Sequence, residues 1–417
     1  MEIKRDLYLQ KLKDRMHNGM IKVITGIRRS GKSYLLFTIF RNYLLSEGVA
    51  DDHMIAIELD ILENAQYRDP HVLLEYIKSR MTDQGEYYIF LDEVQLLERF
   101  EEVLNSLLHK RNVDVYVTGS NSKFLSKDVI TEFRGRGDEV HVYPVCFSEY
   151  MQVFGGDKYE GWSTYMHFGG LPLTITMKTD VQRTQYLTEL FEKTYIKDII
   201  ERNHIEKVQE INDLINVLAS GAGSLTNSSK IVATFKSSIL SDISLNTVRS
   251  YIEYLKDAFI ISEANRYDVK GRKYIGALMK YYFEDIGLRN ARLGFRQIEE
   301  THLMENIIYN ELRMRGYQVD IGVVTKRNRT AAGVQEKKQL EVDFVANMGS
   351  NRYYIQSTFS LPDSDKRAQE KASLINIGDS FKKIIIVRDV IKPWFDDDGI
   401  LTMSVFDFLL KANSLDF

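Results

Sequence analysis

Eight residues near the start of the chain, Gly26 to Ser33, combine the residue types that bind a phosphate chain. They read Gly-Ile-Arg-Arg-Ser-Gly-Lys-Ser and satisfy the pattern G-x-x-x-x-G-K-[ST]. Glycines let backbone N–H groups surround a phosphate, and a helix starting at Lys32 directs its positive dipole end at the same anion. We expect Lys32 to reach the β- and γ-phosphates and the Ser33 hydroxyl to bind Mg²⁺. The predicted nucleotide contacts are Gly26, Ile27, Arg28, Arg29, Ser30, Gly31, Lys32, Ser33 and Tyr34.

The surroundings of these residues decide between a phosphate loop and an ordinary glycine-bearing turn. An apolar run at 22–25 precedes them and a helical run at 34–40 follows, which is the strand–loop–helix context that the motif requires. This context favours the phosphate loop. Arg28 and Arg29 have two open roles, contact with the nucleotide or with a neighbouring acid.

A second motif follows the large residues 87–91, which are typical of a buried strand. Asp92 and Glu93 come directly after them, at the carboxyl end where open α/β sheets bind ligands. We assign Asp92 to the magnesium shell and Glu93 to polarising the attacking water. The alternative is a pair of acids that begins an exposed turn.

Two further segments contain candidate catalytic groups. The run 113–118 ends in a polar turn, where Thr118 or Ser120 would contact the γ-phosphate or the water; a plain strand end is an equal alternative. Arg134 and Arg136 lie in a glycine-rich loop. We take Arg136 as the candidate that stabilises the charge of phosphoryl transfer, within the chain or across a subunit boundary, against a solvated turn.

Several strands and helices must position these groups. Runs at 21–25, 54–59, 87–91 and 113–118 are apolar at consecutive positions, which indicates parallel strands buried on both faces. Residues 147–266 are mainly helical, with a glycine-bearing joint at 220–224. A second α/β unit follows, with a helix at 301–315, a charged hairpin tip or loop at 325–339, and strands at 280–284, 317–324, 341–346, 352–358 and 382–387.

Composition excludes several classes of protein. The chain has 417 residues, 44% hydrophobic and 27% charged, which excludes a wholly disordered protein. Its formal net charge of -4 gives no global attraction for nucleic acid, so any such contact needs a local patch. One cysteine, Cys146, cannot form an internal disulfide. The charged start, Met1 to Asp6, and the lack of an apolar run of about 18 residues predict no membrane contact and a cytoplasmic location.

Taken together, four segments resemble a known family. They are the phosphate loop, Phe-Leu-Asp-Glu-Val-Gln at 90–95, Thr-Gly-Ser-Asn-Ser at 118–122, and Arg-Gly-Arg followed by Tyr-Pro-Val-Cys-Phe-Ser-Glu-Tyr at 143–150. The chain resembles AAA-type ATPases of bacteria and archaea that have a C-terminal domain of unknown function with a restriction-nuclease-like core. Segments 282–288, 305–308 and 341–344 follow in the order of that family. The resemblance implies ATP as the nucleotide and a winged-helix connector.

The two implied C-terminal modules show weaker functional signals. Helical patterns at 230–240 and 244–259, with Ser244 or Asn246 as the cap of the second, fit a winged helix. The outer face of the second helix is mixed in charge, so a role in packing between domains is an alternative to DNA contact. The resemblance implies a nuclease site with Glu305 and Asp343. Gln356 and Thr358 occupy its acid and lysine positions, so we expect no DNA cleavage.

These observations predict an α/β protein with three domains. They are a P-loop NTPase domain of AAA type with a parallel sheet (1–155), a helical and winged-helix region (156–268) and a degenerate nuclease-like α/β domain (269–417). We expect Mg²⁺-dependent ATP hydrolysis that rearranges the C-terminal half against a DNA or protein partner, with a homo-oligomer as an open option. The alternatives are a nucleotide-gated binding switch with little hydrolysis and an active metal nuclease.

Overall fold

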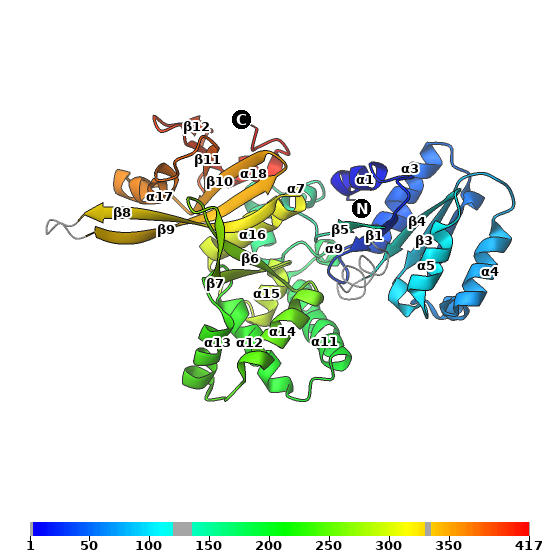
Figure 1. Ribbon diagram of the computed structural model, residues 1–417. Helices are drawn as coiled ribbons and strands as arrows, with labels where there is room; N and C mark the ends of the chain where they lie inside the picture. The colour runs from blue at the N-terminus through cyan, green and yellow to red at the C-terminus, as the bar shows by residue number, and fades with distance from the viewer. Residues whose placement is uncertain (1–2, 120–135, 330–334, 417) are drawn as a thin grey trace. The chain divides into compact units, whose positions relative to one another are not determined.

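The computed structural model describes residues 3–119, 136–329 and 335–416 (Figure 1). The chain divides into two compact units. The N-terminal unit comprises Met1–Val145 and Lys256–Ile260, and the C-terminal unit comprises Cys146–Leu255 and Ile261–Phe417. The three-domain division and its boundaries stay predictions.

A parallel five-stranded sheet forms the centre of the N-terminal unit. Its strand order is β2-β3-β4-β1-β5, and every neighbouring pair is parallel. The strands are β1 (Ile21–Thr25), β2 (Met54–Glu58), β3 (Tyr87–Asp92), β4 (Val113–Thr118) and β5 (Gly137–His141). The four predicted strands are therefore confirmed. β5 was not predicted. Its residues, Gly-Asp-Glu-Val-His, lack an apolar run because β5 is the edge strand of the sheet and pairs only with β1.

Helices cover both faces of this sheet (Figure 1). On one face Ile89 and Val115 pack with residues of α4 and α5, and on the other Phe90 and Tyr116 contact Phe40. This two-sided burial is why the central strands are apolar at consecutive positions. The helices are α1 (Asp6–Lys13), α2 (Lys32–Tyr34), η1 (Leu35–Phe40), α3 (Arg41–Ser46), η2 (Asp51–His53), η3 (Leu62–Arg68), α4 (Pro70–Arg80), η4 (Val94–Leu96) and α5 (Phe100–Leu108).

A buried ion pair, Lys22 with Asp114, interrupts the apolar interior. Lys22 is fully buried and pairs with Asp114, which also accepts hydrogen bonds from Tyr116 Oη (2.8 Å) and from the backbone N–H of His17 (3.1 Å). Burial lowers the pKa of Lys22, whereas Asp114 acts to raise it. The carboxylate is therefore needed to hold this cation inside the sheet.

We expect Asp114→Asn to destabilise the N-terminal unit by about 3–5 kcal/mol, because the substitution leaves the buried ammonium without its counter-ion. Urea unfolding followed by circular dichroism measures this change. Adding Lys22→Met to the variant should recover much of the loss, since it removes the unpaired charge. A loss below about 1 kcal/mol for Asp114→Asn alone would contradict this account.

The C-terminal unit begins with helices. A continuous helical stretch runs from α10 through η6 to α11, within the region 147–266 that the sequence predicts to be mainly helical. Ser244 caps α14 through the backbone N–H of Thr247 (3.0 Å). Among the described residues, no helix has the length and apolarity to cross a membrane. The helices are α7 (Phe147–Met151), α8 (Lys158–Phe168), α9 (Pro172–Thr176), α10 (Asp180–Leu190), η6 (Phe191–Ile196), α11 (Lys197–Arg202), α12 (Val208–Ser220), α13 (Ser228–Thr234), η7 (Phe235–Ile239), α14 (Leu245–Asp257), α15 (Ile286–Arg292), α16 (Glu300–Met314), α17 (Ser364–Ile375) and α18 (Val405–Leu410).

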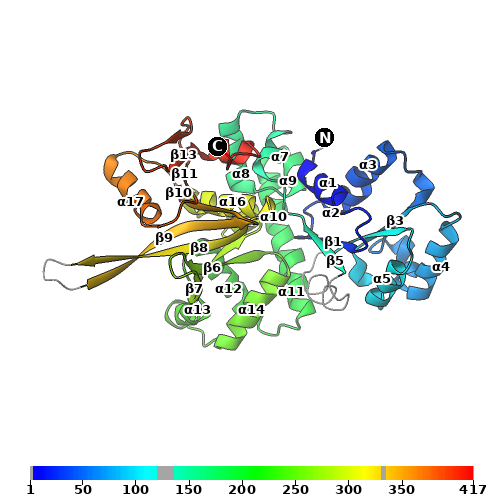
Figure 2. The same ribbon diagram turned by 45° about the horizontal axis from the view of Figure 1, so that its top comes forward.

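An eight-stranded mixed sheet completes this unit, in the order β12-β13-β11-β10-β9-β8-β6-β7. All five predicted strands and the predicted helix, α16, are present. Where the sequence predicts a hairpin tip or loop at 325–339, the described residues are paired strands. They belong to β8 and β9, which lie side by side and extend past the rest of the sheet (Figure 2). The strands are β6 (Ile261–Asp268), β7 (Lys273–Phe283), β8 (Gln318–Arg329), β9 (Gln335–Met348), β10 (Asn351–Thr358), β11 (Lys382–Val387), β12 (Trp394–Phe395) and β13 (Leu401–Ser404).

Asp285 joins α15 to the turn after α8. Its carboxylate accepts hydrogen bonds from the backbone N–H groups of Gly170 (2.8 Å) and Leu288 (3.0 Å). The two segments approach so closely that a Cβ at Gly287 would lie 2.1 Å from the Phe168 carbonyl oxygen. Burial raises the pKa of Asp285 to about 6, although these backbone donors act to lower it.

This raised pKa predicts a pH-dependent stability. An aspartate in the unfolded chain titrates near 4, so between pH 4 and about 6 the folded state binds more protons, and stability falls as pH rises, by about 3 kcal/mol in total. Asp285→Asn should remove this slope, and should lower stability at pH 4 by about 1–3 kcal/mol because an amide NH₂ then faces an N–H donor.

Urea unfolding at pH 4, 5, 6 and 7, followed by tryptophan fluorescence, measures both effects. Both tryptophans, Trp162 and Trp394, lie in the C-terminal unit, so the signal reports on that unit. An unchanged slope in Asp285→Asn would assign the pH dependence to another group.

Candidate functional site

The candidate site is built on the loop 26–33, which joins β1 to α2. At Gly26 φ is +133°, and a Cβ there would lie 2.2 Å from the carbonyl oxygen of Val142. At Gly31, which precedes α2, φ is +95°. Glycine is therefore required at Gly26 by sterics and is favoured at Gly31 by its backbone conformation. The loop has the strand–loop–helix geometry that the sequence predicts.

Two polar side chains of this loop are buried beside its backbone. The Lys32 ammonium is 4% exposed and donates to the carbonyl oxygens of Gly26 (2.9 Å) and Ile27 (3.1 Å). The Ser30 hydroxyl is buried and has no hydrogen-bond partner among the residues that the structure describes. A fixed cation and an unsatisfied hydroxyl are groups that an anion would satisfy.

Asp92, at the end of β3, is hydrogen-bonded to the loop. Its Oδ2 accepts from the Ser33 hydroxyl (2.7 Å), and its Oδ1 accepts from Thr118 at the end of β4. Burial raises the pKa of Asp92, and the two hydroxyl donors lower it. The two residues predicted as magnesium ligands, Ser33 and Asp92, are thus in direct contact. Thr118 supports the carboxylate from the neighbouring strand.

Acidic residues surround Asp92 at this edge of the sheet. Glu58 ends β2 in register with Asp92, and burial, then Asp92 and Asp60, raise the pKa of Glu58. Glu93 and Asp60 likewise raise the pKa of Asp92. The sequence analysis missed Glu58, although its position at the carboxyl end of a predicted strand was an available signal. A bound cation would relieve this mutual repulsion.

Glu93 follows Asp92 in the left-handed backbone region, with φ +50°. Its backbone N–H donates to Thr118 Oγ1 (3.1 Å), and its carboxylate accepts a hydrogen bond from the Gln95 amide. The amide oxygen of Gln95, Oε1, is buried without a partner among the described residues. Gln95 thus orients the predicted base, a role that the sequence analysis did not assign.

The other predicted site residues occupy different positions. Arg28, Arg29 and Tyr34 are exposed on the loop and on α2. Ser120 lies outside the described residues. The backbone of Arg136 accepts from the N–H of Ile21, at the amino end of β1.

The strand β1 separates Arg136 from the phosphate loop. The loop begins after the carboxyl end of that strand, five residues or roughly 16 Å from Ile21. Arg136 therefore lies at the opposite edge of the sheet. This position disfavours its predicted role within the same chain, and a role across a subunit boundary stays a prediction.

These residues fit a magnesium nucleotide. Mg²⁺ prefers oxygen ligands and is usually held by one or two protein oxygens together with substrate phosphates. Ser33 and Asp92 are such a donor set, and Lys32 with the unsatisfied Ser30 hydroxyl suits the phosphates. Among the described parts of the chain, no group of three His, Cys, Asp or Glu side chains is placed to hold a metal alone.

The predicted nuclease residues Glu305 and Asp343 are brought together around a lysine. Glu305 accepts from Lys280 Nζ (2.9 Å) and from Tyr282 Oη (2.6 Å), and Lys280 also contacts Glu341 (2.8 Å). Burial, then repulsion by Glu305, raises the pKa of Asp343. Burial alone would lower the pKa of Lys280, but the carboxylates of Glu305, Asp343 and Glu341 raise it. Lys280 is the first residue of the predicted strand at 280–284, and its role was not predicted from the sequence.

Gln356 and Thr358, on β10, add no charge to this cluster. The Gln356 side chain accepts from the Ser373 hydroxyl (3.4 Å), and the Thr358 hydroxyl donates to the carbonyl oxygen of Ser360 (3.4 Å). Lys280 therefore supplies the positive charge that compensates these acids.

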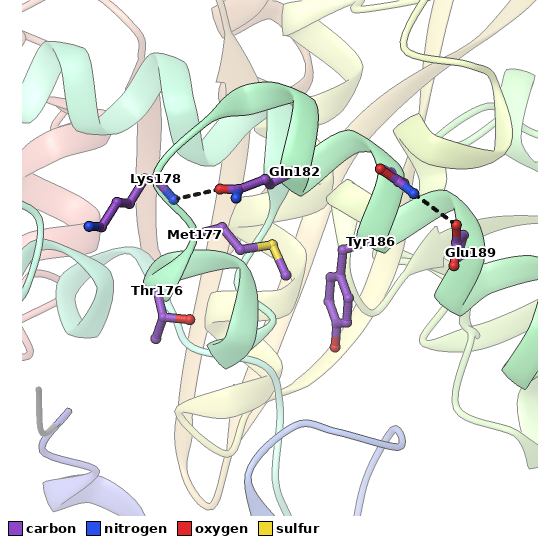
Figure 3. A pocket seen from close by; sticks show the side chains of 7 residues that line it. Thr176, Met177, Lys178, Gln182, Tyr186 and Glu189 are labelled. Carbon is purple, nitrogen blue, oxygen red and sulfur yellow. Dashed lines mark hydrogen bonds between the residues drawn. The ribbon is translucent and has the colours of Figure 1, made fainter.

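A cavity of 650 Å³ lies beside α9 and α10 in the C-terminal unit (Figure 3). Its hydrogen bonds belong to helix structure: the Gln182 side chain accepts from the backbone N–H of Lys178 (3.2 Å), and Gln185 donates to Glu189 (3.1 Å). Thr179 and Gln182 form the capping box of α10. These contacts account for Gln182, Gln185 and Glu189 without a ligand, and we assign no function to this cavity.

Comparison with known proteins assigns the family. A protein of Haemophilus influenzae, described as uncharacterized, is 31% identical over 415 residues, which cover 98% of this chain and 99% of that protein. This chain belongs to the same family. An uncharacterized protein of Methanocaldococcus jannaschii is 27% identical over 386 residues, or 89% of this chain and 80% of its own. The Walker-type ATPase of Pyrococcus abyssi is a solved structure with 16% identity and a TM-score of 0.48, covering 70% of this chain and 96% of that one.

Two family models match parts of the chain. Residues 18–151 match the model described as AAA domain, and residues 159–299 match a domain of unknown function (DUF8612). The N-terminal unit therefore contains an AAA-type P-loop domain, as the sequence predicts, and this domain type supports nucleotide binding at the loop 26–33. The restriction-nuclease-like domain and the winged helix stay predictions.

Proposed function

We propose that this protein is a Mg²⁺-dependent ATPase of AAA type, whose nucleotide cycle rearranges the C-terminal half against a partner. The observation that carries the proposal is the hydrogen bond between Ser33 and Asp92 (2.7 Å). It joins the loop to the acidic end of β3, which is the arrangement that magnesium-bound phosphates require. A cytoplasmic location belongs to the same proposal.

Each residue of the site has a role in this reaction. Lys32 and the loop N–H groups hold the β- and γ-phosphates, and Ser33 with Asp92 would hold Mg²⁺, which neutralises charge on the phosphate oxygens. Glu93 takes a proton from the attacking water, and Gln95 holds the Glu93 carboxylate in position.

A nucleotide-gated switch with little hydrolysis is the second candidate. The observation that favours it is the hydrogen bond from Gln95, which engages the Glu93 carboxylate and weakens it as a base. A phosphate-release assay with Mg²⁺, with and without duplex DNA, separates the two functions. Steady turnover supports the ATPase, whereas tight ATP binding without phosphate release supports the switch.

We also propose that the C-terminal α/β domain binds a partner and does not cut DNA. Lys280 engages Glu305, a carboxylate that a catalytic metal would need, and also pairs with Glu341. Incubation with plasmid DNA and Mg²⁺ should leave the plasmid intact. Cleavage that disappears in Asp343→Ala would overturn this proposal.

A further inference from the structure

The two strands β8 and β9 form a ribbon that leaves the C-terminal sheet. β6 pairs with β8 only as far as Val323, and β10 pairs with β9 only from Phe344 onward. Beyond these points the backbones of β8 and β9 pair only with each other, as far as Arg329 and Gln335. Figures 1 and 2 both show this pair extending past its neighbours.

Like charges face each other across this ribbon. Lys326 is in register with Lys338, so two lysines lie opposite each other. Like charges directly opposite each other destabilise a strand pair. Among the residues whose side chains the structure describes, no carboxylate forms an ion pair with Lys326, Lys337 or Lys338. The opposed pair Lys326 and Lys338 thus carries an electrostatic cost that a polyanion would offset.

These lysines are distributed over both faces of the ribbon. Successive side chains of a strand point to opposite faces, so Lys326 and Lys338 share one face while Lys337 lies on the other. Lys337 and Lys338 are exposed. Cations on both faces suit a position between two rows of negative charge.

The turn between β6 and β7 adds charge of the same sign. Lys270, Arg272 and Lys273 are exposed, and the neighbouring N–H of Val269 donates to the carbonyl oxygen of Val323 (3.0 Å), where the ribbon begins. The whole chain has a formal net charge of -4. This positive region is therefore a local feature that opposes the overall charge, as nucleic-acid contact would require.

We propose that the ribbon, residues 324–329 and 335–341, binds the phosphate backbone of duplex DNA. The major groove of B-form DNA admits a two-stranded β-ribbon and has a phosphate row along each wall. The deep, narrow major groove of an RNA duplex does not admit such a ribbon. An acidic peptide offers one row of charges and leaves one face of the ribbon unpaired.

This inference rests on the proposed function, because it names the partner of that function. Its test contains no ATP. Loss of DNA binding would leave the ATPase assignment intact, and absence of ATP turnover would leave DNA binding intact.

Fluorescence anisotropy with the full chain and a labelled 30-base-pair DNA duplex tests the proposal. The triple variant Lys326→Gln, Lys337→Gln, Lys338→Gln should bind at least about tenfold more weakly, and the slope of log K against log salt should fall by about 2.7, or 0.9 per phosphate contact. The matched control replaces Lys193, Lys197 and Lys207 by Gln, which changes net charge equally at exposed positions in or next to helices.

A second variant distinguishes a loss of positive charge from a loss of folding in the ribbon. Replacing the three ribbon lysines by arginine should retain DNA affinity within about twofold, because the positive charges remain. Equal weakening by the control triple would show a non-local charge effect and overturn the proposal. Undetectable DNA binding by the wild-type chain at 50 mM salt, or competition by an RNA duplex or polyglutamate as effective as that by DNA, would also overturn it.

Discussion

Glu93→Gln should bind ATP with an affinity within about threefold of the wild type but hydrolyse it at least about 100-fold more slowly, because a positioned general base contributes about 10²–10⁴ to rate. Gln retains the volume of the side chain and an oxygen that can accept from Gln95, so the loop is undisturbed. Calorimetric titration and a phosphate-release assay on the same preparation measure the two quantities.

The matched control for this variant is Glu98→Gln, an exposed acid five residues further along the chain. It should keep wild-type turnover. If Glu93→Gln retains turnover, Glu93 is not the base. If its ATP affinity falls together with turnover, Glu93 serves binding.

Asp92→Asn should remove the dependence of ATP affinity on magnesium. The wild-type chain should bind ATP at least about tenfold more tightly with Mg²⁺ than with EDTA, whereas the variant should show a ratio near 1, because a neutral amide is a poor ligand for Mg²⁺. The fold should tolerate the change: burial raises the pKa of Asp92, so removing its charge should leave metal-free stability unchanged or about 1 kcal/mol higher.

Asp52→Asn is the control. Asp52 is exposed and lies before the amino end of β2, whereas Asp92 lies at the carboxyl end of the neighbouring strand β3. This control should keep the wild-type magnesium dependence. If Asp92→Asn keeps the wild-type ratio of ATP affinities with Mg²⁺ and with EDTA, the metal binds elsewhere. If the variant loses much of its stability, Asp92 is a structural residue.

The phosphate loop and the central strands were predictable because their signals are local. The loop pattern needs only neighbouring residues, and strands buried on both faces, such as β3, are apolar at consecutive positions. The proximity of Ser33 and Asp92 also followed, since the loop that carries Ser33 begins after the carboxyl end of β1 and Asp92 ends the parallel strand β3.

The features that the sequence analysis missed depend on pairing between distant segments. β5 is polar and is a strand only because its backbone pairs with β1. That pairing also places Arg136 at the amino edge of the sheet, which a glycine-rich sequence does not reveal. Lys280 lies 25 residues before Glu305, and only the fold brings their charges together.

The account depends on a triphosphate bound at the loop 26–33, and calorimetric titration of ATP with Mg²⁺ into the wild-type chain and Lys32→Ala tests this most directly. Charged hydrogen bonds contribute about 1.5–3 kcal/mol each, so losing the ammonium should weaken binding by at least about 100-fold. Lys78→Ala, on the exposed surface of α4, is the control and should bind as the wild type does. We expect one ATP per chain for the wild type and no measurable heat for Lys32→Ala; equal affinity in both would contradict the account.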